Sequence, residues 1–242
     1  MSLGKHIFLS FAAGMGALAI IPAPAAAGTV VAATGPSAGT YPVGTRIADT
    51  QRVTLRSGDK LTVLDSGGTR VLSGPGTFVL ARQGAQARNS RLQALTTQRS
   101  ATRARTGAVR PVYAEDISNP SLWYVDVAAS GKICLADANA INLWRADTSA
   151  AQTYTVTALT APGDGVQVSF AEKEMLGQWG AALQLREGET YTITAPAGAS
   201  AAEVRFSFIG AVPDDVEDLA VKLIENGCMV QLGQLANENN AG

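Results

Sequence analysis

The chain is nearly without histidine and poor in cysteine, and both shortages exclude whole classes of chemistry. His6 is the only histidine, and it lies in an N-terminal segment that we expect to be removed on export. The mature chain is then expected to have no Ser-His or Cys-His nucleophile, no histidine-ligated metal and no imidazole pH switch. Cys134 and Cys228 lie far apart in the sequence, which excludes a CxxC metal or redox motif. In an oxidising compartment, such a pair predicts a disulfide.

Long hydrophobic runs are also scarce, because only the run from Ile7 to Ile21 is long enough to interact with a membrane. Lys5 and His6 precede this run, and the small residues Ala25, Ala26 and Ala27 follow it. This order is typical of a Sec signal peptide covering residues 1–27. An uncleaved membrane anchor is the alternative. We therefore expect a bacterial periplasmic or secreted protein.

Acidic residues are absent between Asp65 and Glu115, although the whole chain has 20 Asp and Glu against 19 Lys and Arg. The first half of the chain is consequently basic and the second half acidic. This split predicts electrostatic docking of the two halves, a basic arm aimed at an anionic envelope polymer or membrane, or a simple solvated linker. The candidate binding arginines in this stretch are Arg99, Arg103 and Arg105. Nucleic acid is not expected, since the arginines lack interleaved aromatic residues and follow an export signal.

The Ala-, Gln- and Arg-rich segment 83–111 has helix-forming composition, but few large apolar residues. A basic helix and a disordered linker both remain open for it. Before it, residues 28–40 are rich in Gly, Ala and Ser and predict a flexible leader. Residues 41–82 alternate short polar and β-branched runs with Gly-containing turns, which predicts a small antiparallel β-roll.

The segment VTLRSGDKLTVLDSGGTRVLSGPGTFVL, residues 53–80, resembles the repetitive strand pattern of FecR-type periplasmic domains. The resemblance implies a β-roll or jelly-roll-like module and a location in the cell envelope. It brings no catalytic residues and no cofactor. Only six residues precede the apolar run, whereas FecR proteins that regulate sigma factors have a cytoplasmic segment there, so we do not expect sigma-factor signalling.

Residues 112–236 predict a β-sandwich, because about eight short alternating strands fall between 122 and 209 with tight turns between them. The stretch 121–147 is expected to organise this module, since it holds two of the three tryptophans and one cysteine. A helix over 215–226 follows from an Asp cap, an apolar stripe and the terminating Gly227. Residues 237–242 are expected to form a disordered tail. The predicted fold is mainly β.

Three groups of side chains are candidates for ligand contacts. Trp144 and Arg145, with Asp147 nearby, predict either a ligand lip or a core tryptophan with solvated neighbours. Trp179 and the pair Trp123-Tyr124 predict either a sugar-stacking platform or core filling. Four glutamates are candidates for a hydrolytic carboxylate pair or a calcium site, with a solvated sheet edge as the alternative: Glu172, Glu174, Glu187 and Glu189.

None of these patterns is a catalytic signature, and no metal or cofactor site is predicted. We expect a non-enzymatic exported envelope protein that makes contacts with another protein or with an assembly. A module that binds carbohydrate or a cell-wall polymer is the alternative, and a hydrolase with a carboxylate site is the third hypothesis.

Overall fold

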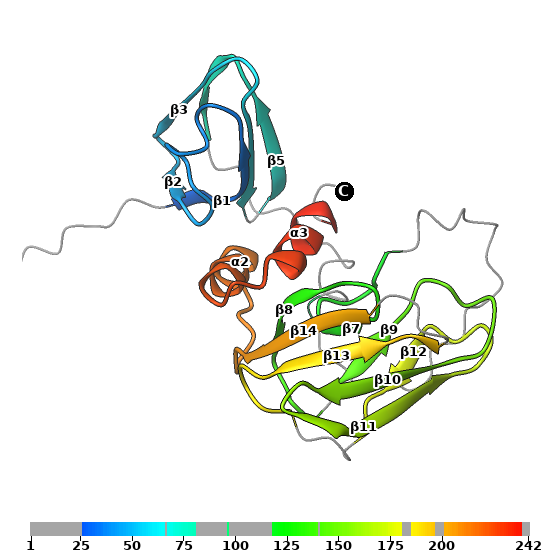
Figure 1. Ribbon diagram of the computed structural model, residues 1–242. Helices are drawn as coiled ribbons and strands as arrows, with labels where there is room; N and C mark the ends of the chain where they lie inside the picture. The colour runs from blue at the N-terminus through cyan, green and yellow to red at the C-terminus, as the bar shows by residue number, and fades with distance from the viewer. Residues whose placement is uncertain are drawn as a thin grey trace, which may run out of the picture.

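The computed structural model describes residues 26–65, 67–80, 96, 118–139, 141–180, 185–196 and 201–238. Two β-modules and a pair of helices between them form this part of the chain (Figure 1). The predicted mainly β fold with a C-terminal helix is confirmed. The signal peptide before Ala26 lies outside the described residues, and so does segment 83–111 except for Thr96. No helix within the described ranges is long and apolar enough to cross a membrane.

The N-terminal module is built from short strands in which buried apolar side chains alternate with exposed side chains. Four strands form an antiparallel sheet in the order β2-β1-β4-β5: β1 (Ala26–Thr34), β2 (Arg46–Ala48), β4 (Lys60–Asp65) and β5 (Gly68–Ser73). A separate ribbon pairs β3 (Arg52–Leu55) with β6 (Gly76–Val79). The two sheets enclose a small apolar core that includes Val30, Ile47, Val53, Leu61 and Val63. The alternation in the sequence predicted these strands because burying one face is a local property of each run.

The prediction of a flexible leader over 28–40 is wrong, because these residues include most of β1, an inner strand of the sheet. β1 pairs with β2 on one side and β4 on the other. The small residues that suggested flexibility permit close packing instead. A Cβ atom added at Gly28 would lie 2.7 Å from Val63 Cγ1 and 2.9 Å from the Leu64 carbonyl oxygen. Cleavage after Ala27 stays a prediction, and it would fall inside β1.

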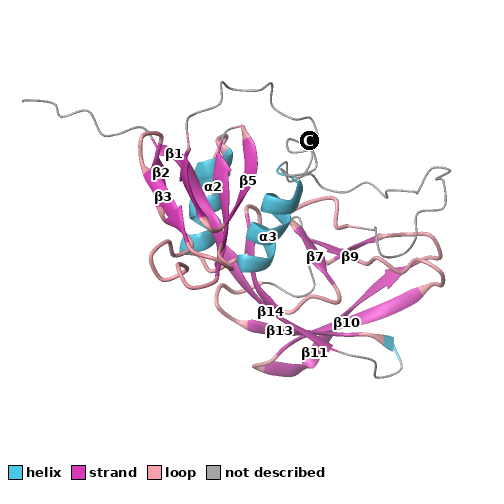
Figure 2. Cartoon of the chain, turned by 90° about the horizontal axis from the view of Figure 1, so that it is seen from above, coloured by secondary structure: helices cyan, strands magenta, loops and turns pink. Residues whose placement is uncertain are grey.

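The second module is a two-layer sandwich (Figure 2). One layer has five strands in the order β11-β10-β13-β14-β8, and the other has three in the order β12-β9-β7. Their bounds are β7 (Tyr124–Asp126), β8 (Gly131–Leu135), β9 (Asn142–Trp144), β10 (Gln152–Ala158), β11 (Ala161–Phe170), β12 (Leu176–Gln178), β13 (Thr190–Thr194) and β14 (Ala201–Phe208). β14 runs parallel to β8, and β7 runs parallel to β9, whereas the other pairs are antiparallel.

The helix predicted over 215–226 is α2 (Val216–Glu225). The Asp215 side chain accepts hydrogen bonds from the backbone N–H groups of Glu217 and Asp218, which caps the helix as the sequence predicted. Gly227 then adopts a φ of 72°, a left-handed conformation that favours glycine and ends the helix.

A second helix, α3 (Met229–Glu238), was not predicted, and it corrects the tail assigned to 237–242 because Asn237 and Glu238 belong to it. Its buried side is formed by Leu232, Leu235 and Ala236. Together with Cys228, these positions follow helical spacing, so a signal was present in the sequence. Gly227 before the helix and Gly233 within it concealed that signal, since glycine normally weakens a helix.

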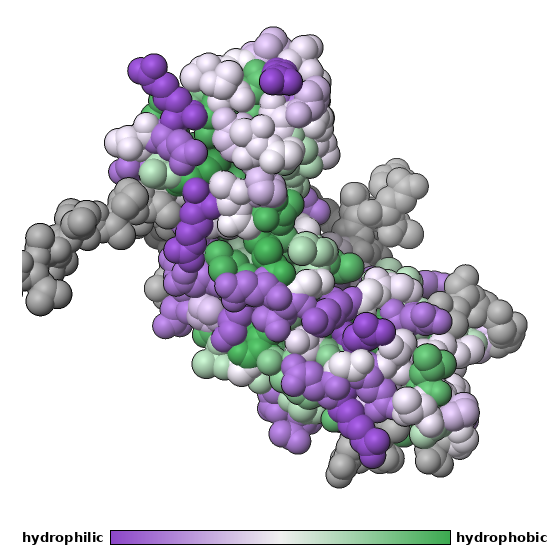
Figure 3. All heavy atoms as spheres, turned by 60° about the vertical axis from the view of Figure 1, so that its left-hand side comes forward, coloured by the Kyte–Doolittle hydropathy of each residue, from purple (hydrophilic) through white to green (hydrophobic). Residues whose placement is uncertain are grey.

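The two β-modules contact each other through a shared apolar core around the helices. Val31 and Leu64 of the first module meet Leu219 and Leu223 of α2 and Leu232 of α3 in one cluster. This cluster also contains residues of the sandwich, among them Leu122, Trp123 and Ile209. The Thr69 hydroxyl adds a hydrogen bond to the carbonyl of Ala236. Outside this shared core, the apolar side chains on the face drawn in Figure 3 form small areas separated by polar side chains. Within the described residues, apolar packing therefore joins the modules, while electrostatic docking through the Arg-rich segment 83–111 stays a prediction.

The salt dependence of the overall size tests this arrangement. Arg46 and Asp218 form an ion pair of 3.2 Å between β2 and α2, but both side chains are more than half exposed. Such exposed pairs contribute little to stability and are screened by salt. We expect the radius of gyration measured by X-ray scattering to stay constant between low and about half-molar salt. Growth of the particle with salt would contradict an apolar interface.

Candidate functional site

Arg145, predicted at a ligand lip, lies inside the sandwich with 1% of its surface exposed. Its guanidinium donates to the carbonyl oxygens of Ala150, Ala171 and Glu174 at 2.8, 2.8 and 3.0 Å. The same group lies 5.0 Å from the centre of the Phe170 ring. The guanidinium fork thus ties the loop after β9 to the turn after β11. Trp144 is a core residue, but both alternatives for Arg145, a ligand lip and a solvated strand end, are wrong, because this side chain is buried against three carbonyls.

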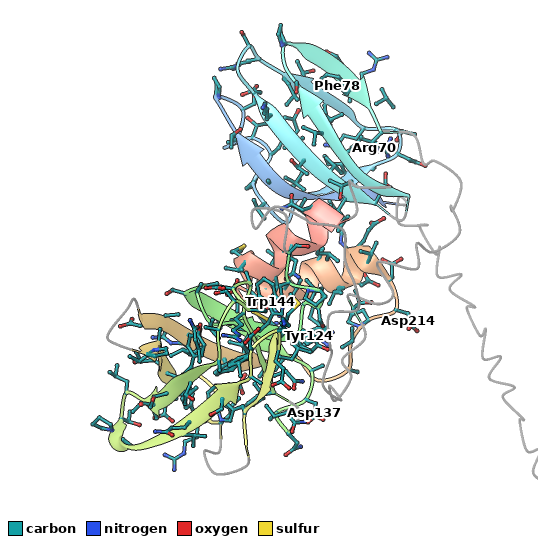
Figure 4. All side chains as sticks on the ribbon, turned by 90° about the vertical axis from the view of Figure 1, so that its right-hand side faces the viewer. Arg70, Phe78, Tyr124, Asp137, Trp144 and Asp214 are labelled. Carbon is teal, nitrogen blue, oxygen red and sulfur yellow. A yellow bond between two sulfur atoms is a disulfide. The ribbon has the colours of Figure 1, made fainter. Side chains whose placement is uncertain are left out.

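The tryptophans predicted as a stacking platform are core residues. Trp179 is 6% exposed and packs edge-on against Tyr191 and Phe206, with ring centres 5.6 and 5.7 Å apart. Trp123 is fully buried, and its indole N–H donates to the carbonyl of Thr96. Trp144 is 3% exposed and lies in the sandwich close to Tyr124 (Figure 4). A sugar cannot stack on these rings as they stand, so core filling, the other alternative for Trp123 and Trp179, is confirmed.

The four glutamates lie in two turns, one after β11 and one before β13, rather than sharing one site. Glu174 accepts a hydrogen bond from the backbone N–H of Ala171, and Glu187 accepts from the N–H of Phe208. Glu189 accepts from the hydroxyls of Thr160 and Tyr191, and Glu172 pairs with Lys173. Within the described ranges, no group of three or more His, Cys, Asp or Glu side chains is placed to hold a metal ion. These contacts favour a structural role for the carboxylates.

The predicted bridge between Cys134 and Cys228 is confirmed. It joins β8 to the short connection between α2 and α3. Sequence reasoning missed its neighbour Gln231, whose side chain is 3% exposed. The Gln231 amide accepts from the backbone N–H of Cys134 at 2.6 Å and donates to the carbonyls of Leu122 and Cys134. Disulfide and amide together fix α3 on the sandwich.

A shallow depression without room for a water molecule lies in the N-terminal module, beside Asp59 and Ser37. The Asp59 carboxylate is 1% exposed and accepts from the backbone N–H groups of Ser37 and Arg56. Burial raises the pKa of this carboxyl, but the hydrogen bonds from Ser37 and Arg56 outweigh it and leave the pKa below its usual value. The depression therefore lies where two turns pack together. The Asp59 carboxylate beside it already accepts hydrogen bonds from both turns.

The remaining candidate residues, Arg99, Arg103 and Arg105, lie outside the described part of the chain. No protein-family model, no curated protein and no solved structure matches the chain. The resemblance to FecR-type domains therefore stays a prediction.

The Asp126 carboxyl at the end of β7 is partly buried, and burial disfavours its charged form. Burial raises its pKa, although its Oδ1 accepts a hydrogen bond from the N–H of Ala128. A folded-state pKa above the unfolded value means that stability is greatest at low pH and falls as the pH rises through the folded pKa. Asp126→Asn retains the acceptor and removes the charge. We expect this variant to melt at a higher temperature than the wild type at pH 7, with the difference shrinking towards pH 4.

Asp137→Asn is a matched control, because Asp137 makes the same type of bond to the N–H of Asn139 at an exposed position. Calorimetry of both variants across this pH range measures the effect. A lower melting temperature for Asp126→Asn at pH 7 would show that the ionised carboxylate stabilises the turn.

Proposed function

We propose that the chain is a non-enzymatic exported protein of the bacterial envelope that acts through contacts with another protein or an assembly. The buried disulfide supports this, since such bonds persist in oxidising compartments. The aromatic, cationic and carboxylate candidates that the structure describes all have structural contacts. Function through an outer surface agrees better with these contacts than function through a catalytic cleft.

The exposed Val71 on strand β5 carries the proposal. β5 is the last strand of its sheet and pairs with β4 alone among the described residues. Val71 is 49% exposed there. Edge strands are usually protected by lysine, proline or a bulge, because their free N–H and C=O groups recruit other strands. β5 has neither lysine nor proline, and its Arg70 pairs back with Asp65 of β4.

An edge of this kind suits a partner that adds an extended strand to the sheet. In that binding mode, main-chain hydrogen bonds supply affinity and exposed side chains supply selectivity. Val71 and Ser73 are both exposed and two residues apart, so they lie on the same face of the strand. We infer that the partner contacts this face of β5.

Site-specific photocrosslinking in the living cell tests the proposed edge. A photoreactive residue at Ser73 is expected to give one discrete adduct with an envelope protein. Val71→Lys should abolish that adduct by placing a charge on the edge, while the melting temperature changes little. The matched control is Leu159→Lys, because Leu159 is an equally apolar side chain that is 64% exposed in the other module. Absence of an adduct, or its survival in Val71→Lys, would contradict the proposal.

A further inference from the structure

Two nearly identical pentapeptides lie side by side in the five-stranded layer. Residues 153–157 read TYTVT in β10, and residues 190–194 read TYTIT in β13. The strands pair directly and antiparallel. The second and fourth side chains of each pentapeptide enter the core, where Tyr191 and Ile193 are fully buried. Because side chains alternate along a strand, the threonines face outward, away from the core that the two layers share.

Four of these threonines form a compact block. Thr155 is opposite Thr194, and Thr157 is opposite Thr192. All four are partly exposed. No side-chain hydrogen bond joins their hydroxyls to any described residue. The outer threonines differ: Thr153 bonds to Ser169 at 3.0 Å, and Thr190 accepts from Arg205 at 3.1 Å. The block thus presents four hydroxyls whose donors and acceptors are available.

The neighbouring strand β11 borders this block with Gln167, an exposed residue opposite Thr155, and with Gly165. Gly165 is the residue beside Thr155 and Thr157, and a Cβ atom there would lie 3.0 Å from Thr155 Cγ2 and 3.0 Å from Thr157 Oγ1. Any side chain at this position would crowd the two threonines. The glycine keeps the hydroxyl of Thr157 accessible from the direction of the sheet edge.

The chemistry of this face selects the kind of ligand. Outward side chains with charge begin at Glu203 and Arg205 of β14, while the outward residues of β10 and β13 are neutral threonines. A protein interface is normally enriched in aromatic residues, methionine and arginine, which this block lacks. An anionic polymer would need cationic partners. A neutral polymer with many hydroxyls needs neither the residues typical of a protein interface nor cationic partners.

The spacing of the block also suits an extended chain of sugars. Adjacent strands are about 4.8 Å apart, and alternate residues of one strand are about 6.7 Å apart. Hydroxyls at these intervals can both donate to and accept from successive sugar hydroxyls. The threonine methyl groups provide an apolar floor for the C–H faces of the rings. We propose that the Thr155, Thr157, Thr192 and Thr194 block binds an extended neutral polysaccharide.

Depletion of the purified protein by polysaccharide particles tests the proposal. The probes are insoluble neutral β-1,3-glucan, β-1,4-glucan and α-glucan, with the anionic polymer alginate for comparison. We expect the wild type to bind a neutral glucan, and Thr157→Val with Thr192→Val to weaken binding about tenfold or more, since valine keeps the shape and removes the hydroxyl. The control is Thr54→Val with Thr77→Val, an exposed cross-strand pair of the other module whose hydroxyls are 3.3 Å apart. This control should bind as the wild type does.

Failure to bind any of the neutral glucans would overturn the proposal and assign the threonines to ordinary solvated strand positions. Stronger retention by alginate, or equal retention of the two valine pairs, would overturn it as well. The result is separable from the contact proposed at β5. Val71→Lys should leave glucan retention unchanged, and the valine pair at 157 and 192 should leave the crosslink from Ser73 unchanged.

Discussion

Replacing both Cys134 and Cys228 with alanine is expected to lower the free energy of unfolding by roughly 4 to 5 kcal/mol, or less if the unfolded chain keeps residual structure. The bridge closes a loop of 94 residues, and a long loop loses much entropy when it is cross-linked in the unfolded state. Both cysteines are fully buried in the core shared by the modules. Alanine at both positions leaves no thiol to re-form a bridge.

Urea unfolding followed by tryptophan fluorescence measures this effect, because Trp123 belongs to the same apolar cluster as the two cysteines. Wild-type protein that has been reduced while unfolded and refolded in reductant is the control, and it should match the alanine pair. The Gln231 hydrogen bonds to Cys134 use backbone atoms, so they survive the substitution. A loss below about 1 kcal/mol would mean that these hydrogen bonds and the apolar packing alone define the position of α3.

The predictions that were confirmed rested on local chemistry. The Asp215 cap, the apolar stripe of α2 and the stop at Gly227 all act within a few residues of one another. The strands of the sandwich likewise follow from alternation along each run. The single cysteine pair could be assigned because two cysteines allow one intramolecular pairing.

The predictions that were wrong depend on contacts between distant segments. β1 looks flexible by composition, but only glycine fits at position 28, because a Cβ atom there would lie within 3 Å of Val63 and Leu64 of another strand. The sequence shows that Arg145 follows a tryptophan, but not that three carbonyls from residues 150, 171 and 174 converge on it. Core filling and a stacking platform both stayed open for Trp179, because the rings that bury it, Tyr191 and Phe206, follow later in the chain.

The threonine block shows the same division between local and distant information. The pentapeptides TYTVT and TYTIT are visible in the sequence, and their alternation predicts which side chains face outward. Their pairing as neighbours is a property of the fold, because β11 and β12 lie between them in the chain. Only the register places Thr157 opposite Thr192.

Replacing Arg145 with methionine is expected to lower the free energy of unfolding by at least about 3 kcal/mol, because it leaves three carbonyls in the interior without their donors. Methionine keeps much of the side-chain length and packing, so the loss reports mainly on hydrogen bonds.

Arg145→Lys should recover only part of the loss. An ammonium keeps the charge but cannot reproduce the planar fork that reaches the carbonyls of Ala150, Ala171 and Glu174 together. The control is Arg186→Met at an exposed position, for which a change within about 0.5 kcal/mol is expected. Urea unfolding of the three variants under non-reducing conditions provides the comparison. Equal stability of Arg145→Met and Arg186→Met would contradict this prediction and would mean that water replaces the guanidinium at the three carbonyls.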